Sequence, residues 1–293
     1  MRNKTAFGSF IVAAVMFACL GSGVRAETLA VKDGEKMAFL GDSITAGGWG
    51  SPTGYVRLIV AGLATSGIKV EPIPAGIGGH KSNDMLARLE KDVISKKPDW
   101  VTISCGVNDV WHGANGVPLD QYKENMTAIV DQAQAAGIKV MILTATMITE
   151  DAANPNNQKL EAYNAFLRTL AAEKKCLLAD LNKAMQAALK EGEATGKARG
   201  KMLTSDGVHM NPYGDMMMAS TVLTAFGLTT EQLTKAQAAW LDIPAGITVT
   251  VRQSMSLREY QDLEAKAGKQ SVEGMLQGEL SQKVQTILKE SAK

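Results

Sequence analysis

The chain contains three histidines, the only side chains whose charge ordinarily changes between pH 5 and 8. A hydrolase that relies on general base catalysis needs such a group, so the candidates are His80, His112 and His209. His209 follows Asp206 by three residues, a spacing that places both side chains on one side of a turn. The carboxylate can then accept a hydrogen bond from Nδ1 while Nε2 faces a nucleophile. The alternative is a loop histidine that caps the helix expected from Pro212.

A candidate nucleophile, Ser43, stands where the apolar segment 37–40 ends and a helical pattern begins. Reacting groups of doubly wound sheets gather at the carboxyl ends of the strands. Gly41 lets the chain turn sharply there, so the hydroxyl of Ser43 can point into a crevice. The same residues would also make an ordinary turn from strand to helix with an N-cap, so this segment alone does not decide between the two interpretations.

Three more segments that combine glycine with polar residues lie beside the other expected strands. Residues 76–79 follow the second strand, residues 106–109 follow the third, and residues 206–209 precede the last helix of the domain. Each therefore falls at the carboxyl end of a strand or in an adjoining loop, where a catalytic centre of such a sheet is expected.

Together these four segments resemble the SGNH hydrolases, also called GDSL esterases and lipases, and the resemblance runs from about residue 36 to 226. It implies that Ser43 is the nucleophile, that His209 is its general base and that Asp206 orients and charge-balances the imidazole. The resemblance thus favours a hydrolase over the simple turn.

The resemblance also implies an oxyanion hole formed by the backbone N–H groups of Ser43 and Gly79 and by the side-chain amide of Asn108. This assignment is physically reasonable because fixed donors stabilise the charge of a tetrahedral intermediate, and an amide has no charge to lose by titration. The chain departs from the family in having Pro74 and Ala75 where an asparagine is common, and Gly78 in place of a polar residue, which puts the shape of this loop in question.

Several side chains near these segments are candidates for substrate binding. Trp49, Trp111, His112 and the loop 147–157 would form a platform for a sugar, and His80 also adjoins the second glycine segment. Simple packing or surface roles explain these residues equally well.

Hydrophobic periodicity predicts the elements that position the site. Short apolar runs alternate with helical patterns, as in a parallel sheet flanked by helices. The expected fold is α/β, a three-layer α/β/α sandwich with a flavodoxin-like five-stranded parallel sheet. The two prolines at 72 and 74 place the second strand at an edge. The predicted strands are 37–40, 68–73, 100–104, 139–144 and 176–181, and the predicted helices are 55–64, from 82, 119–137, 159–173 and 212–226.

The predicted catalytic domain covers residues 27–228, and residues 229–293 form a mainly helical C-terminal extension. In this extension, residues 247–251 alternate like an exposed strand, and residues 256–291 read as two polar helices broken near Gly268. No chemistry is assigned to this part of the chain.

The N-terminus predicts an exported protein. Arg2 and Lys4 precede the apolar run 10–20, and Val24 and Ala26 are small residues of the kind that a signal peptidase accepts. Residues 1–26 are therefore interpreted as a signal peptide, and the mature chain as periplasmic or secreted, with no integral membrane span. An N-terminal membrane anchor is the alternative, and a lipoprotein anchor at Cys19 is disfavoured by the bulky residues before it.

Composition excludes several other functions. The 293 residues carry a net charge of +1, which provides no field for collecting phosphate backbones, so no nucleic-acid partner is expected. The chain has no P-loop, no dinucleotide-binding glycine motif and no cluster of histidine and cysteine, so neither a cofactor nor a metal is expected. Cys105 and Cys176 are expected at opposite rims of the sheet, where they would not pair.

The expected activity is that of an exported serine esterase, which hydrolyses a carboxylic ester through an acyl-enzyme on Ser43. The resemblance favours short O-acyl groups, O-acetyl in particular, on carbohydrate. The alternatives are a lysophospholipase or thioesterase that accepts longer acyl chains, and an SGNH-type acyltransferase in which a sugar hydroxyl replaces water. A non-enzymatic binding module is disfavoured because Ser43, Asn108, Asp206 and His209 are all present. The sequence does not predict an oligomeric state.

Overall fold

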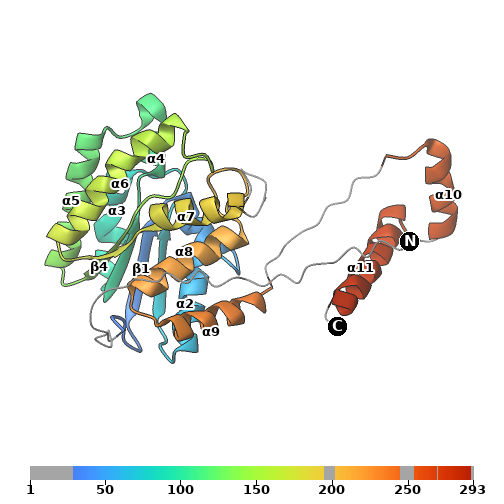
Figure 1. Ribbon diagram of the computed structural model, residues 1–293, viewed down its shortest axis with the longest axis horizontal. Helices are drawn as coiled ribbons and strands as arrows, with labels where there is room; N and C mark the ends of the chain where they lie inside the picture. Colours follow the sequence, from blue (N-terminus) through green and yellow to red (C-terminus); the bar gives the residue numbers. More distant parts are fainter. Residues whose placement is uncertain (1–28, 195–201, 245–253, 269, 292–293) are drawn as a thin grey trace. The chain divides into compact units, whose positions relative to one another are not determined.

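The computed structural model describes residues 29–194, 202–244, 254–268 and 270–291 (Figure 1). The chain divides into two compact units, residues 1–246 and residues 247–293. The first unit contains a five-stranded parallel sheet in the order β2-β1-β3-β4-β5, which confirms the predicted flavodoxin-like α/β fold. Its strands are β1 (Lys36–Gly41), β2 (Glu71–Gly76), β3 (Trp100–Ser104), β4 (Lys139–Leu143) and β5 (Leu177–Ala179).

The helices of this unit lie in two layers on the two faces of the sheet (Figure 1). In one layer, α3 (Ser82–Asp92) packs against α5 (Leu119–Ala135), and α5 packs against α6 (Pro155–Glu173). In the other layer, α8 (Pro212–Ala225) contacts α2 (Tyr55–Thr65), α7 (Leu181–Ala194) and α9 (Thr230–Leu241). Because both faces are covered, β3 and residues 37–41 of β1 are buried on both sides of the sheet. Two short helices, α1 (Ser43–Gly50) and α4 (Val107–Trp111), begin close to the carboxyl ends of β1 and β3.

The second strand lies at the edge of the sheet, as its prolines predict, but it is three residues later than the predicted segment 68–73. Glu71 N donates to Glu35 O, so alternate residues of β2 face β1. Pro72 and Pro74 fall at the intervening positions, where a strand inside the sheet would need N–H groups for a second neighbour. The prolines are therefore part of the strand, and they do not end it.

Two helices differ from the prediction. α6 begins at Pro155 and not at residue 159, because Asn154 accepts a hydrogen bond from Asn156 N and Pro155 occupies the first turn. α7 was not predicted. Its buried residues Leu181, Met185 and Leu189 recur every four positions, and the helix starts inside the segment that was assigned to the fifth strand.

α9 packs against α2 and α8 as part of the first unit, whereas the predicted catalytic domain ends at residue 228. Ala236 and Trp240 are the buried residues of α9. Gly62 of α2 leaves room for this contact, since a Cβ at that position would lie 3.2 Å from the ring of Trp240. The compact unit consequently extends to Gly246.

In the second unit, α10 (Leu257–Ala267) and α11 (Val272–Ser291) lie on either side of Gly268, whose φ is +63°. The strand predicted at 247–251 and the signal peptide predicted at 1–26 lie outside the described residues. None of the helices within the described ranges is long and apolar enough to cross a membrane. Cys105, which follows β3, and Cys176, which precedes β5, are both free thiols on either side of β4.

Candidate active site

Ser43, His209 and Asp206 form a continuous line of hydrogen-bonded side chains. Ser43 is the first residue of α1, directly after β1, and the preceding Asp42 caps the helix by accepting from Ile44 N. His209 Nε2 lies 2.9 Å from Ser43 Oγ, and His209 Nδ1 lies 2.6 Å from Asp206 Oδ2. Because a carboxylate only accepts, Nδ1 is assigned the proton, which leaves Nε2 free to accept the serine proton.

The Asp206 carboxylate also shapes the turn that carries His209. Its Oδ1 accepts from the backbone N–H groups of Val208 and His209 at 2.9 and 2.8 Å. Burial acts to raise the pKa of Asp206, but the hydrogen bonds from the His209 ring and from these two N–H groups outweigh it and lower the pKa to about 2. The carboxylate therefore stays charged across the neutral range, where it orients the imidazole.

The second glycine segment passes directly beside the nucleophile. A Cβ on Gly78 would lie 3.8 Å from the Cβ of Ser43, and Gly79 has a φ of +77° that suits glycine. The N–H of Ser43 is at the first position of α1, where helical N–H groups have no partner within the helix. These two backbone segments thus flank the same Oγ.

Asn108 joins the first, second and third segments. It is a buried residue of α4 whose Nδ2 donates to His80 O at 3.1 Å and to Asp42 Oδ2 at 3.4 Å. Its Oδ1 lies 3.2 Å from Nε2 of His112. Since Oδ1 can only accept, this contact places the proton of His112 on Nε2 and fixes which way the amide of Asn108 faces.

Asp42 is a buried carboxyl next to the nucleophile. Burial raises its pKa, the hydrogen bond from Ile44 N lowers it and the nearby charge of Asp109 raises it, and the resulting pKa is about 6. Asp109 is itself fully buried and accepts from both the backbone N–H and the hydroxyl of Ser82. Two carboxyls and one amide therefore lie beneath the site with few water contacts.

Arg88 is a site residue that the sequence reasoning missed. Its guanidinium donates to Gly41 O at the end of β1, to Ala75 O near the end of β2, and to Nδ1 of His80. This buried cation therefore ties the first segment to the second. The one sequence cue is a charged residue on the apolar face of the helix, next to Leu89.

The remaining aromatic candidates lie in different places. Trp111 is 47% exposed and meets the ring of His112 edge-on, with the ring centroids 6.1 Å apart. The guanidinium carbon of Arg57 lies over the ring of Trp49, 4.3 Å from its centroid, and Arg57 also donates to the Trp49 carbonyl. Within the described ranges, these contacts of Trp49 are with Arg57 and the core, and no hydrogen bond joins it to Ser43 or His209.

The loop 147–157 supplies little surface for a sugar platform at its start. Met147, Ile148 and Glu150 are buried, and the Asn157 side chain ties the loop to itself through Ile148 O and N. The first half of the loop thus acts as packing, although residues 151–153 are exposed.

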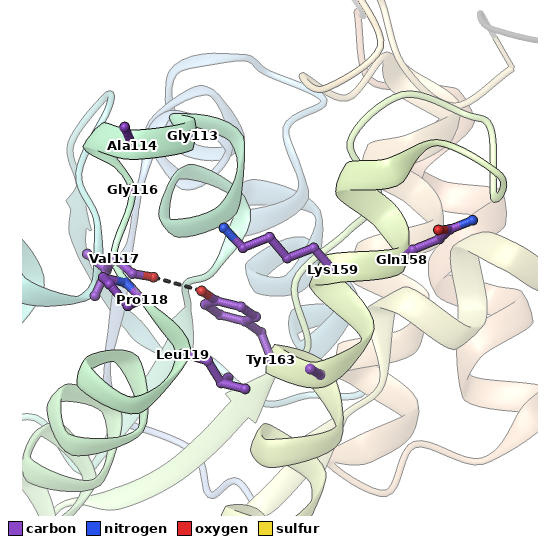
Figure 2. Close-up of a pocket in the computed structure, with 10 residues that line it drawn as sticks. Gly113, Ala114, Gly116, Val117, Pro118, Leu119, Gln158, Lys159 and Tyr163 are labelled. Atoms are coloured by element: carbon purple, nitrogen blue, oxygen red, sulfur yellow. Dashed lines mark hydrogen bonds between the residues drawn. The ribbon is translucent and has the colours of Figure 1, made fainter.

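A shallow groove of about 440 Å³ lies between α6 and the residues that follow α4, as Figure 2 shows. Tyr163 of α6 donates to Val117 O at 2.8 Å across its floor, and Lys159 extends along it. Its lining does not include Ser43 or His209. In the part of the chain that is described, no group of three or more His, Cys, Asp or Glu side chains is arranged to hold a metal ion.

Comparison with known proteins supports the same interpretation of the chain. Residues 39–216 match the model of the GDSL-like Lipase/Acylhydrolase family. An acetylxylan esterase of Geobacillus stearothermophilus is 30% identical over 67% of this chain and 96% of its own length. Esterase TesA of Pseudomonas aeruginosa is 30% identical over 66% of this chain and 90% of its own length.

Solved structures agree with the sequence relatives. The structure of an acetyl xylan esterase, AlAXEase, superposes with a TM-score of 0.61 at 37% identity and covers 65% of this chain and 98% of that one. The acetylxylan esterase Axe2 of Geobacillus stearothermophilus superposes with the same score at 27% identity. This chain belongs to the GDSL-like lipase/acylhydrolase, or SGNH hydrolase, family and is a carboxylic ester hydrolase.

Proposed function

We propose that this protein is an exported serine esterase that removes short O-acyl groups, O-acetyl above all, from carbohydrate. The observation that carries the proposal is the line from Ser43 Oγ through His209 to Asp206, with contacts of 2.9 and 2.6 Å. An activated serine is the nucleophile that ester hydrolysis through an acyl-enzyme requires.

In the proposed reaction, Ser43 Oγ attacks the ester carbonyl carbon while its proton passes to Nε2 of His209. The tetrahedral intermediate collapses as His209 returns this proton to the departing alcohol oxygen, which leaves the acyl group on Ser43. Water then attacks the acyl-enzyme, His209 takes a proton from it, and the acid is released as Ser43 regains its hydrogen. Asp206, with its low pKa, stabilises the imidazolium in each step.

The charge on the former carbonyl oxygen needs fixed donors. The backbone N–H groups of Ser43 and Gly79 and the amide of Asn108 are proposed for this role. The close approach of the glycine segment to Ser43 supports this role, and the contact between His112 Nε2 and Asn108 Oδ1 fixes which way the amide of Asn108 faces.

The substrate class is supported by the relatives. The match with the acetylxylan esterase of Geobacillus stearothermophilus covers 96% of that esterase's own length. An acetyl group needs little apolar surface, which suits a site whose acid and base are partly open to solvent. Export is proposed from the N-terminal pattern of basic residues followed by an apolar run.

Acetate release from acetylated xylan, measured beside hydrolysis of p-nitrophenyl acetate and p-nitrophenyl octanoate, tests the activity and the substrate. We expect acetate release, a preference for the acetate ester, and loss of both activities in Ser43→Ala. Ser51→Ala is the matched control, because Ser51 follows the same helix and its hydroxyl forms a hydrogen bond with the Thr53 hydroxyl, away from the proposed chemistry. A preference for octanoate without acetate release would contradict the substrate, and an active Ser43→Ala would contradict the mechanism.

Export has its own test. When the full chain is produced in a bacterial host, we expect it outside the cytoplasm with an N-terminus at Glu27. Recovery of the uncleaved chain from the cytoplasm alone would contradict this part of the proposal.

A further inference from the structure

Glu150 is a buried carboxylate that the proposed chemistry does not use. It lies in the loop between β4 and α6 and is 6% exposed. Four hydrogen bonds reach it from three successive residues: Oε2 accepts from Met202 N at 2.9 Å, while Oε1 accepts from Leu203 N at 2.9 Å, from Thr204 N at 2.7 Å and from the Thr204 hydroxyl at 2.6 Å.

These donors keep Glu150 ionised. Burial acts to raise its pKa, but the hydrogen bonds from the Thr204 hydroxyl and from the three backbone N–H groups outweigh burial and lower the pKa below its usual value. A charged acceptor makes each of these bonds stronger than a neutral one would. The carboxylate therefore fixes the backbone of residues 202–204.

That backbone leads directly into the turn with the acid and the base. Thr204 Oγ1 donates to Glu150 and accepts from Gly207 N at 3.2 Å, and Gly207 lies between Asp206 and His209. On the other side of the turn, Gly207 O accepts from Thr149 N at 2.7 Å. Glu150, through Thr204, and its neighbour Thr149 thus hold the turn at the N–H and at the C=O of Gly207.

The loop that carries Glu150 and the turn that carries His209 each contain a residue with a positive φ. Thr149, a β-branched residue, has a φ of +64°, and Gly207 has a φ of +102°. A β-branched residue in the left-handed region is unfavourable and persists only where surrounding contacts require it. The four hydrogen bonds at Glu150, together with the bond from Thr149 N to Gly207 O, hold this loop against the turn.

We propose that Glu150 is a positioning residue for the Asp206–His209 turn, which it places so that Nε2 of His209 reaches both Ser43 Oγ and the departing alcohol oxygen. This inference rests on the proposed function, in which His209 transfers the proton. Proton transfer requires hydrogen-bond distance, and a displacement of about 1 Å can cost on the order of a hundredfold in rate.

Esters with different leaving groups separate this role from a purely structural one. An alkoxide is a poor leaving group and needs the proton from His209, whereas p-nitrophenolate departs without one. If the turn is displaced, hydrolysis of an alkyl ester should therefore fall further than hydrolysis of a p-nitrophenyl ester. A variant in which part of the protein is merely unfolded loses the same factor on both esters.

The experiment compares kcat/KM for ethyl acetate and p-nitrophenyl acetate in the full chain carrying Glu150→Gln. The glutamine has the same shape, but its NH2 group faces an N–H donor that the carboxylate accepted. General acid and base catalysis contributes about 10²–10⁴-fold, so we expect a loss of roughly a hundredfold on ethyl acetate, roughly tenfold on p-nitrophenyl acetate, and a KM within about twofold of the wild type. Glu173→Gln is the control, because it removes an exposed carboxylate at the end of α6.

A second pair of variants tests the path through Thr204. Thr204→Val removes the hydroxyl that joins Glu150 to Gly207, and we expect the same unequal loss on the two esters. Thr204→Ser keeps the hydroxyl and should restore the wild-type ratio. This pair remains informative if Glu150→Gln fails to fold.

The proposal is overturned if a folded Glu150→Gln or Thr204→Val loses the same factor of kcat/KM on both esters. It is also overturned if neither variant loses activity on either ester. These results are distinct from failure of the proposed function, which would appear as an active Ser43→Ala. Unequal losses with rescue by Thr204→Ser would support the positioning role.

Discussion

Asn108 illustrates what the sequence predicts at a single residue and what it does not. The resemblance of its segment to the SGNH hydrolases predicts that it is an oxyanion donor, but the direction of its amide depends on neighbours from other segments. His80 O accepts from Nδ2, while His112 Nε2 donates to Oδ1. His80 and His112 were predicted as possible substrate contacts, and the structure gives each a bond to Asn108. A histidine next to a motif can therefore contact the substrate or can orient Asn108, and its position in the sequence does not distinguish these two roles.

The first prediction concerns this pair of side chains. Removing one oxyanion donor costs about 10²–10³ in kcat, which is the loss expected for Asn108→Ala. His112→Ala should cost less, on the order of tenfold or about 1.4 kcal/mol, because it only leaves the amide without its orienting partner. Steady-state kinetics with p-nitrophenyl acetate measures both variants.

The double variant distinguishes the two possible roles of His112. If His112 acts through Asn108, the double variant should be no slower than Asn108→Ala alone, because the orientation of an absent amide has no effect. Multiplied losses would instead mean that His112 contacts the substrate independently.

The residues that the sequence missed share a physical feature. Ser43, Asp206 and His209 are found from short-range spacing and from the end of a strand. Arg88 and Glu150 act on backbone groups far away in sequence, at Gly41 O and at the N–H groups of residues 202–204. Backbone groups have no residue type, so no pattern of letters marks these partners.

At the scale of elements, α2 and α8 are joined by a cap that comes from a distant helix. Gly54 precedes α2 and has no side chain to cap it. Asp215 of α8 instead accepts from Tyr55 N at 2.8 Å, 160 positions away in the chain. The two helices pack side by side (Figure 1). Burial raises the pKa of Asp215 to about 6, although the bond from Tyr55 N lowers it.

The second prediction is the pH dependence of stability at this cap. Because the folded pKa of Asp215 lies near 6 and the unfolded value near 3.8, the stabilisation is fully present below pH 4 and is lost as the pH rises through 6. The difference corresponds to roughly 3 kcal/mol. The wild type should therefore gain up to this amount over Asp215→Asn as the pH falls from 7 to 4.

Urea unfolding of both proteins at several pH values measures this difference. The asparagine keeps an oxygen acceptor for Tyr55 N, so the comparison isolates ionisation from loss of the cap. A stability difference that is constant between pH 4 and 7, or that grows in favour of the asparagine as the pH falls, would contradict the prediction.

The elements themselves were predictable where the periodicity is clear. The strand order and the layers follow from the alternation of apolar runs and helical patterns. β2 was predicted three residues too early, and its position at the edge of the sheet explains why its prolines are tolerated inside the strand. α7 was missed because its first residue continues the apolar run of β5.

At the scale of the whole molecule, the extent of the catalytic unit was not predictable from composition. α9 has only two buried residues, Ala236 and Trp240, on an otherwise polar helix. The sequence placed the boundary at residue 228 because the helix predicted at 212–226 closes the alternating pattern and the pattern of the chain changes after it. α9 nevertheless packs against α2, where a Cβ on Gly62 would lie 2.5 Å from Leu223 Cδ1 of α8 and 3.2 Å from the ring of Trp240.

The third prediction therefore concerns two truncations. A chain that ends at Gly246 keeps every described residue of the site and all of α9, and its kcat/KM and urea midpoint should match those of the full chain. A chain that ends at Leu228 loses α9 and uncovers the apolar face of α2 against which it packs. Loss of a buried tryptophan alone costs about 3–5 kcal/mol, so the shorter chain should be destabilised by at least this amount.

Trp240→Ala in the full chain is the matched variant, because it removes the largest buried side chain of α9 without shortening the protein. It should reproduce most of the destabilisation of the chain that ends at Leu228 and leave kcat/KM unchanged under conditions where the protein is folded. The reason is that α9 contributes packing to α2 and α8, while Ser43, Asp206 and His209 lie on other segments. If the chain ending at Leu228 is as stable as the one ending at Gly246, then α9 is an appendage after all and the boundary belongs at residue 228.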